Sequence, residues 1–120
     1  MPAALVFAID AVLVLVFVLI GRATHAETPV LGALITYWPF LTGLVVGWLV
    51  SRAWRRPLSV VRTGLIVWPA TVVIGLLLRV LSDQGVQWSF VIVTSVVLGV
   101  FLVGWRGVAA LVRSRRTARP

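Results

Sequence analysis

Residues 3–21, AALVFAIDAVLVLVFVLIG, decide the fold, because this run is apolar throughout except for Asp10. Its length is close to the roughly 20 residues that an α-helix needs to span the hydrocarbon core of a bilayer. Three further apolar runs of similar length cover residues 31–50, 60–81 and 86–105. In lipid every backbone polar group must be bonded within the protein, and four short segments cannot close a strand barrel. We therefore predict an all-α membrane protein with four transmembrane helices.

The composition agrees with a chain that faces lipid. Of its 120 residues, 61% are hydrophobic and only 12% are charged, whereas a soluble domain carries about a quarter charged residues. The formal net charge of +8 comes from eleven arginines set against three acidic residues. Because the arginines lie at the ends of the apolar runs, we expect them to contact anionic lipid headgroups and not nucleic acid.

The sequence carries no enzyme signature. The absence of cysteine excludes disulfides, thiolate metal sites and cysteine nucleophiles. No phosphate-binding glycine loop, nucleophile elbow or HExxH motif is present. We expect no cofactor and favour a non-enzymatic role, with chemistry on lipids by Asp10 or His25 left as an open alternative.

The links between the apolar runs are short and cover residues 22–30, 51–59 and 82–85. Short links make neighbouring helices antiparallel and predict an up-down bundle. Residues 1–106 then form a single transmembrane domain, and residues 107–120 form a basic tail. The first run has no basic segment before it and contains a carboxylate, so we expect a retained helix and not a cleaved signal peptide.

The distribution of arginine predicts the orientation, because positively charged links stay in the cytoplasm. Nine of the eleven arginines belong to the second link, the start of the third helix and the tail. We therefore expect a multi-pass protein of the plasma membrane, with both termini and the second link in the cytoplasm. The nine arginines are Arg52, Arg55, Arg56, Arg62, Arg106, Arg113, Arg115, Arg116 and Arg119.

A weak internal repeat appears when the chain is shifted by 57 residues. The shift aligns Arg22 with Arg79, Gly47-Trp48 with Gly104-Trp105, and Arg56 with Arg113. Such a repeat predicts two tandem helical hairpins related by an axis along the membrane normal. An apolar background also produces chance identities, so the sequence leaves both origins open.

Small residues recur at helical spacing and predict close helix packing in lipid. The stripes are Gly43, Gly47 and Ser51 on the second helix, and Ser95 and Gly99 on the fourth. On the third helix one face carries Gly64, Trp68, Thr71, Gly75 and Arg79. That face is too polar for lipid, so we expect it to point into the bundle.

Asp10 lies two turns inside the first helix, toward its cytoplasmic end. An intramembrane carboxylate is costly and normally pairs, titrates or faces water. Its expected partners are Arg62, at the start of the third helix, and Arg106, at the end of the fourth. Two interpretations stay open: a buried Asp–Arg ion pair, and a site that responds to protons or cations.

A second polar cluster is predicted at the outer end. It comprises Arg22, His25 and Glu27 with Arg79 and Asp83 from the third link. His25 and Glu27 are too few for a zinc site, which needs three or four ligands. The alternatives are interfacial anchoring and a site for a ligand or an ion.

Two Trp-Pro pairs, Trp38-Pro39 and Trp68-Pro69, interrupt the second and third helices. Each proline frees a carbonyl that can stay buried or bind a ligand, and Thr36 and Tyr37 lie just before Pro39. We expect three further tryptophans to be interfacial residues: Trp54, Trp88 and Trp105. The candidate polar or ligand-site residues are Asp10, Arg22, His25, Glu27, Tyr37, Trp68, Thr71, Arg79 and Arg106.

Four stretches carry a family resemblance: IDAVLVLVFVLIGRATHAE (9–27), ITYWPFLTGLVVGWL (35–49), RTGLIVWPATVVIGLLLR (62–79) and SFVIVTSVVLGVFLVGWR (89–106). Through them nearly the whole chain resembles a family of small four-helix membrane proteins of unknown function, DUF3054, found in actinobacteria and haloarchaea. The most specific parts of the resemblance are the Asp10 helix with its Gly21-Arg22…His25 ending, Pro39-Phe40, and Gly104-Trp105-Arg106. The family has GRRSH where this chain has GRATH, which retains Arg22 and His25. The resemblance implies the fold and the membrane location and supplies no activity.

Three classes of function remain open from the sequence. The first is a non-catalytic accessory or assembly subunit of a membrane complex, packing through its small-residue faces. The second is a small transporter or channel-like unit with polar inward faces. Because four helices barely enclose a cavity, this class requires an oligomer. The third, a membrane enzyme or cofactor holder, is disfavoured by the single histidine and the lack of cysteine.

Overall fold

The computed structural model describes residues 2–22, 29–84 and 86–117, and the described residues form helices joined by short links. The helices are α1 (Ala3–Arg22), α2 (Pro29–Ser51), η1 (Ala53–Arg55), η2 (Val60–Gly64), α3 (Leu65–Leu81), α4 (Trp88–Leu102) and α5 (Gly104–Thr117). No strand occurs in this part of the chain. Four helical segments are long and apolar enough to cross a membrane: Ala3–Gly21, Leu34–Ser51, Val60–Leu81 and Trp88–Arg115. The predicted all-α fold with four spans is confirmed.

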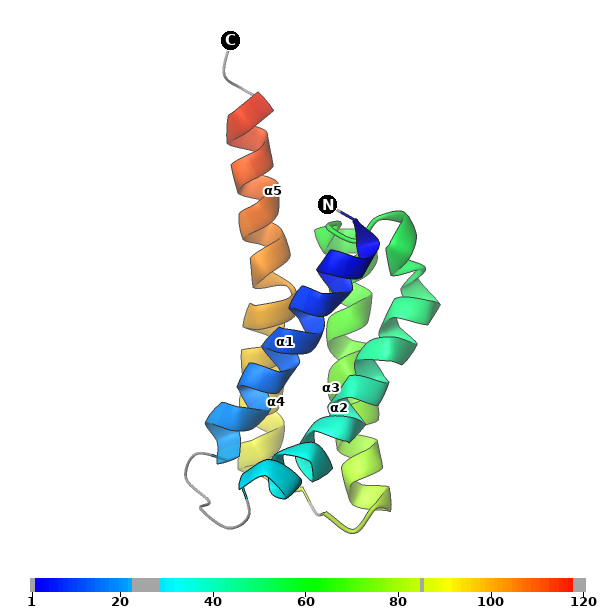
Figure 1. Cartoon of the computed structure of the whole chain (residues 1–120), viewed down its shortest axis with the longest axis vertical. Helices are drawn as coiled ribbons and strands as arrows, with labels where there is room; N and C mark the ends of the chain where they lie inside the picture. The colour runs from blue at the N-terminus through cyan, green and yellow to red at the C-terminus, as the bar shows by residue number, and fades with distance from the viewer. Residues whose placement is uncertain (1, 23–28, 85, 118–120) are drawn as a thin grey trace.

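The spans run alternately down and up, so the N-terminus, the link after α2 and the C-terminal helix share one end (Figure 1). We call this the arginine-rich end, after Arg52, Arg55 and Arg56 of the link and Arg113 and Arg115 of α5. The opposite end carries the end of α1, the start of α2 and the link after α3. The predicted up-down bundle is therefore the one observed.

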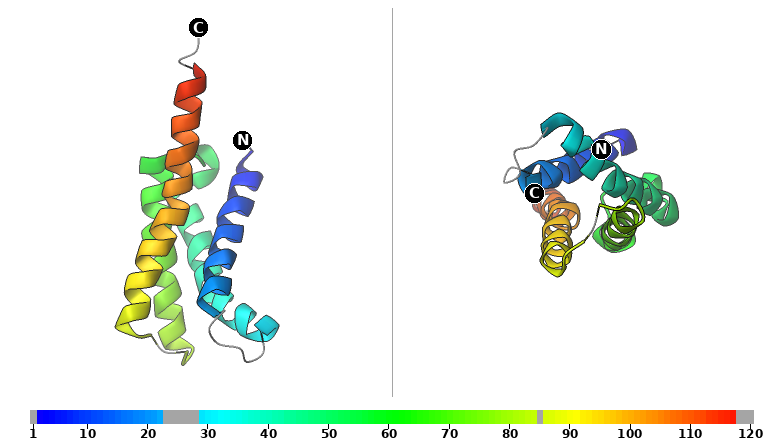
Figure 2. Two further views of the ribbon diagram at one scale, coloured as in Figure 1. Left: turned by 90° about the vertical axis from the view of Figure 1, so that its left-hand side faces the viewer. Right: turned by 90° about the horizontal axis from the view of Figure 1, so that it is seen from below.

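The closest pair of helices is α2 and α3, which lie side by side in both views of Figure 2. A Cβ atom on Gly43 would lie 2.9 Å from the Cα of Thr71, and one on Gly47 would lie 3.0 Å from the Cα of Val67. Glycine is thus required for the backbones to approach this closely. Gly43 and Gly47 therefore pack against α3 inside the bundle.

Two more glycines pack against aromatic rings. Gly99 of α4 lies against the indole of Trp68, and Gly75 of α3 lies against the ring of Phe40. Phe40 also makes an edge-to-face contact with Phe17 of α1, with 5.6 Å between the ring centroids. These aromatic contacts join α1, α2 and α3 around the core. The inward face expected for the third helix is therefore the observed one, with Thr71 and Gly75 fully buried.

The third span begins with an irregular turn. Arg52 adopts a left-handed backbone conformation, with φ 52° and ψ 48°, which ends the run of α2. After η1, the hydroxyl of Ser59 accepts a hydrogen bond from the backbone N–H of Arg62 at 3.1 Å and so caps η2. The π-helical turn η2 buries Thr63 and Gly64. It therefore decides which residues at the start of this span face the bundle.

The last span differs most from its predicted bounds, 86–105. α4 ends at Leu102, and after a break at Val103 the chain continues as α5 to Thr117. Arg106, expected to end the fourth helix, lies instead in the first turn of α5. This helix projects past the rest of the bundle at the arginine-rich end (Figure 1). Its exposed apolar residues are Val108, Leu111 and Val112.

Candidate functional site

The only acidic residue within a predicted span, Asp10, is fully buried and forms an ion pair with the fully buried Arg106. The guanidinium binds both carboxylate oxygens: Nη2 donates to Oδ2 at 2.5 Å and Nη1 donates to Oδ1 at 2.8 Å. Two parallel charge-assisted hydrogen bonds of this kind are stronger than neutral ones and fix the geometry of the pair. Asp10 lies on α1 and Arg106 on α5, so the pair joins the first span to the last.

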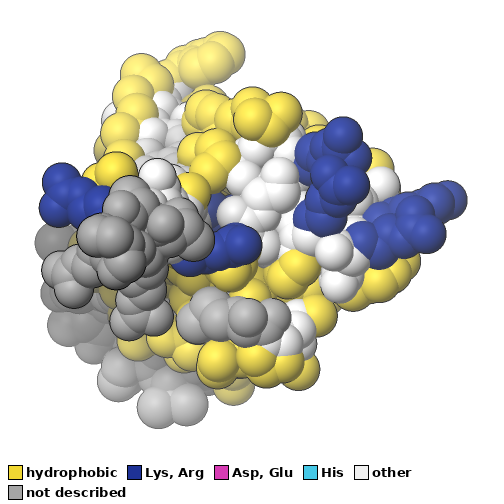
Figure 3. All heavy atoms as spheres, turned by 90° about the horizontal axis from the view of Figure 1, so that it is seen from above, with side chains coloured by type: hydrophobic (Ala, Val, Ile, Leu, Met, Phe, Trp, Pro, Cys, Tyr) yellow, Lys and Arg dark blue, Asp and Glu magenta, His cyan; other side chains and the backbone are white. Residues whose placement is uncertain are grey.

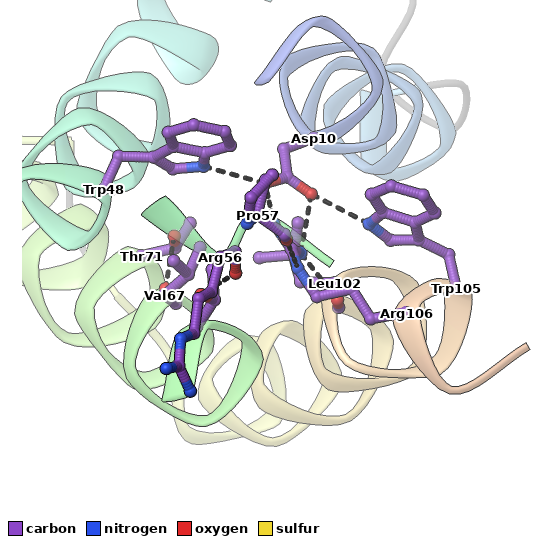
Figure 4. A network of polar contacts seen from close by, with 10 residues as sticks. Asp10, Trp48, Arg56, Pro57, Val67, Thr71, Leu102, Trp105 and Arg106 are labelled. Atoms are coloured by element: carbon purple, nitrogen blue, oxygen red, sulfur yellow. Dashed lines mark hydrogen bonds and ion pairs between the residues drawn. The ribbon is translucent and has the colours of Figure 1, made fainter. Parts of the chain in front are cut away.

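Two indoles complete the coordination of the carboxylate (Figure 4). Trp48 of α2 donates its Nε1–H to Oδ2 at 2.8 Å, and Trp105 of α5 donates its Nε1–H to Oδ1 at 2.9 Å. Asp10 thus accepts four hydrogen bonds, two on each oxygen. An ionised carboxylate offers about four lone-pair sites. The protein alone saturates this carboxylate.

The guanidinium of Arg106 uses four of its five N–H groups in hydrogen bonds. Its Nε donates to the carbonyl of Pro57 at 2.8 Å, and Nη1 donates a second bond to the carbonyl of Leu102 at 2.8 Å. Pro57 lies in the link between η1 and η2, where no helix uses its carbonyl. We call Asp10, Arg106, Trp48, Trp105 and these two carbonyls the Asp10 cluster. It connects α1, α2, the second link, α4 and α5.

Packing at Gly64 keeps room for this arginine. A Cβ atom at that position would lie 3.4 Å from the Cδ of Arg106 and 3.7 Å from the Cα of Val103. Beside it, the hydroxyl of Thr63 donates to the carbonyl of Arg56 at 2.5 Å and so ties η2 to the same link. The inward side of η2 therefore supports the Asp10 cluster with small side chains.

Of the two partners expected for Asp10, the structure selects Arg106. Arg62 lies on the exposed side of η2 and does not pair with Asp10. The physical reason is the π-helical turn, which directs Thr63 and Gly64 inward and leaves Arg62 outside.

Two members of the cluster were missed from the sequence. The interpretation of Trp105 as an interfacial residue is wrong, because its indole N–H binds Asp10. Trp48 was not recognised as a donor either. The signal that could have found both is the offset of 57 residues, which aligns Gly47-Trp48 with Gly104-Trp105. By contrast, Trp54 and Trp88 are 50% and 83% exposed, as expected of residues beside headgroups.

The opposite end holds the second predicted cluster, of which only part is described. The side chain of Arg22 and the whole of His25 and Glu27 lie outside the described residues. Arg79 donates from Nη1 to Oε1 of Gln84 at 3.1 Å, and its guanidinium lies 4.7 Å from the centroid of the Phe90 ring. This arginine is thus held by an amide and an aromatic face.

Gln84 also bonds the backbone carbonyl that Pro39 leaves without a helical donor. Proline has no N–H, so the carbonyl four residues earlier, that of Ile35, loses its helical donor. The amide Nε2 of Gln84 donates to that carbonyl at 3.1 Å. The freed group is therefore bonded to a side chain from the third link. Nothing in the sequence pattern distinguished Gln84 from other polar residues of the links.

Three other side chains from the predicted site donate hydrogen bonds to backbone carbonyls of the helices. Tyr37 donates to Ala11 at 2.8 Å, Trp68 donates to Ser95 at 2.9 Å, and Thr71 donates to Val67 at 2.7 Å. These bonds join α2 to α1 and α3 to α4, and the third lies within α3. None of them reaches the Asp10 cluster.

Two buried hydroxyl oxygens stand apart from these, because neither has a hydrogen-bond partner among the described residues. One is Oγ of Ser51, a partly exposed residue at the end of α2. The other is Oγ1 of Thr94 of α4, which is fully buried. Nothing in the sequence pattern distinguished it from the other hydroxyls of the spans.

Together, these observations define a multi-pass membrane protein with four apolar spans and one saturated intramembrane ion pair. A family model described as protein of unknown function (DUF3054) matches residues 7–109, and the chain belongs to this family. The match includes Asp10, Trp48, Trp105 and Arg106. No curated protein and no solved structure matches the chain at a significant level.

Proposed function

We propose that this chain is a non-catalytic accessory or assembly subunit of a larger membrane complex. The saturated carboxylate carries the proposal. Both oxygens of Asp10 are occupied by donors of the protein itself, so this residue has no lone pair left for a solute. A buried ion pair of this kind fixes the arrangement of helices, which suits a scaffold.

The small-residue stripes do not supply the surface for a partner, contrary to our expectation from the sequence. Gly43, Gly47 and Gly99 are occupied by neighbours within the chain. Helix α5 is better placed, because it projects past the bundle with Leu111 exposed beside the exposed Arg115. An apolar residue and a cation on adjacent turns of one helix suit a partner with an acidic, partly apolar surface.

The test is purification of the tagged full-length chain from its native membrane in a mild detergent, followed by mass spectrometry and native sizing. We expect a stoichiometric larger complex, and we expect Leu111→Arg to release the partner while a matched change at the opposite end, Leu81→Arg, does not. Recovery of the chain alone, as a monomer or homo-oligomer, would contradict the proposal.

Transport by a homo-oligomer is the competing function. The buried, unpartnered hydroxyl of Thr94 is the one observation that favours it, because such a group can bind a polar solute. Flux of a solute into liposomes that contain only this purified chain would support transport and overturn the accessory role. Loss of that flux in the Thr94→Val variant would show that the solute passes the hydroxyl of Thr94.

We also propose that both termini face the cytoplasm, in the plasma membrane. The support is the gathering of Arg52, Arg55 and Arg56 at the end that holds both termini. Since the chain has no cysteine, Ser89→Cys and Ser114→Cys each supply a single thiol at opposite ends. In intact cells a membrane-impermeant maleimide should label the thiol at position 89 only. Labelling at position 114 alone would reverse the orientation.

A further inference from the structure

An open groove lies at the arginine-rich end, between the second link and α5. Its walls are apolar and are formed by Leu58, Val60 and Val61 from the link side and by Val108 and Val112 from α5. Its arginines are Arg55, Arg56 and Arg113. The groove therefore combines a hydrocarbon surface with several positive charges.

No acidic side chain lines this groove. Of the chain's three acidic residues, Asp10 is fully buried and paired, and the other two, Glu27 and Asp83, belong to the links of the opposite end. The view onto the arginine-rich end shows several arginine side chains and no acidic side chain (Figure 3). Among the described residues, the charged side chains that line this groove are all positive, so the groove favours an anion.

The position of the groove adds a second requirement. It lies between the end of α2 and the start of η2, where two candidate spans end and begin. At the ends of membrane spans, apolar side chains generally border the hydrocarbon region and arginines lie beside the headgroups. Valine and leucine walls suit an acyl chain, and guanidinium groups bind phosphate bidentately. A soluble anion would leave these apolar walls exposed.

We propose that this groove binds one anionic phospholipid, with its phosphate at Arg55 and Arg56 and an acyl chain along Val60, Val61 and Val108. The proposal depends on membrane insertion and not on the accessory role. If either the lipid-binding proposal or the accessory role is refuted, the other is unaffected.

The groove is built on the Asp10 cluster. Trp105 lines the groove and donates to Asp10, and Pro57 lines it and accepts from Arg106. The hydrogen bond from Arg106 to the carbonyl of Pro57 thereby holds the link against α5, and the ion pair with Asp10 holds Arg106 in place. Loss of the pair is expected to weaken lipid binding as well as the fold.

The experiment is a titration of the purified full-length chain, in neutral-detergent micelles, with dioleoyl phosphatidylglycerol or dioleoyl phosphatidylcholine. Native mass spectrometry reports the number of lipids bound. We expect one phosphatidylglycerol to bind in preference to phosphatidylcholine. Each arginine beside an anionic headgroup contributes about a five-fold change in affinity, so Arg55→Gln with Arg56→Gln should weaken binding about twenty-five-fold. Arg62→Gln is the matched control, because Arg62 is exposed on the same segment and does not line the groove.

A second pair of variants tests the acyl chain. Ala110 lines the groove and is exposed, whereas its neighbour Leu111 is exposed and does not line the groove. Ala110→Trp should block the bound lipid, and Leu111→Trp should leave it in place. The proposal fails if the two lipids bind equally, if Arg62→Gln weakens binding as much as the paired change, or if the two tryptophan variants behave alike. Equal competition by glycerol phosphate would also overturn it.

Discussion

Each end of the bundle holds an arginine inside the helical packing, but the two arginines are bonded in different ways. Arg106 is fully buried and meets a carboxylate that two indoles also bind. Arg79 is half-buried and contacts an amide and a phenyl ring. The first arrangement places full charges of both signs in a fully buried site, whereas the contacts of Arg79 within the described residues are with neutral groups. Disruption of the first should therefore cost far more than disruption of the second.

The largest expected effect comes from Asp10→Asn. The amide nitrogen cannot accept a hydrogen bond, so the two donors on that atom lose their acceptor, and the charge of Arg106 is left buried without its counter-ion. Breaking one side of a buried pair costs about 3–5 kcal/mol. This loss of stability is measured as the change in the free energy of unfolding in mixed detergent micelles, with unfolding followed by circular dichroism. Arg62→Gln serves as the control and should change stability by less than about 0.5 kcal/mol.

An intermediate effect is expected from the indole donors. Trp48→Phe and Trp105→Phe each remove one N–H and keep an aromatic ring, so each should cost about 1.5–3 kcal/mol, the range for a hydrogen bond to a charged group. Trp88→Phe, at a residue that is 83% exposed, should cost little in the same micelle assay. If all three variants were equally stable, the indoles would be packing residues and not ligands of the carboxylate.

The smallest effect is expected at the opposite end. Gln84→Ala should cost about 1 kcal/mol, because the carbonyl of Ile35 and one N–H of Arg79 lose a neutral partner. In a Pro39→Ala background the helix regains a donor for that carbonyl, so the same change at position 84 should cost less. An equal cost in both backgrounds would show that the bond to Ile35 contributes nothing. The same unfolding assay measures both.

The sequence allowed the four spans to be predicted, because apolar runs of membrane length leave no alternative to helices. It also identified Asp10 as an intramembrane carboxylate, with a buried ion pair as one of two open interpretations, and Arg106 as one of its two expected partners. Which of Arg62 and Arg106 pairs with Asp10 could not be predicted, because the answer depends on the π-helical turn at η2. Hydropathy does not distinguish such a turn from a regular helix.

The remaining donors could not be predicted for a different reason. Trp48, Trp105 and Gln84 reach their acceptors only because of the rotation of each helix about its axis. Periodicity within a single helix gives the face that points inward but not the neighbour that it meets. Tryptophans near the ends of spans are usually interfacial, and that general tendency misled the interpretation of Trp105.

Asp10 and Arg106 should act as one energetic unit inside the bundle, because each is the charged partner of the other. A double-mutant cycle with Asp10→Asn, Arg106→Gln and the paired variant measures their coupling directly, from the unfolding free energies of the four proteins in the same micelles. We predict a coupling energy of about 2 kcal/mol or more, with the paired variant more stable than the sum of the two single losses implies. Additive losses would contradict the account, because they would mean that the two side chains stabilise the fold independently.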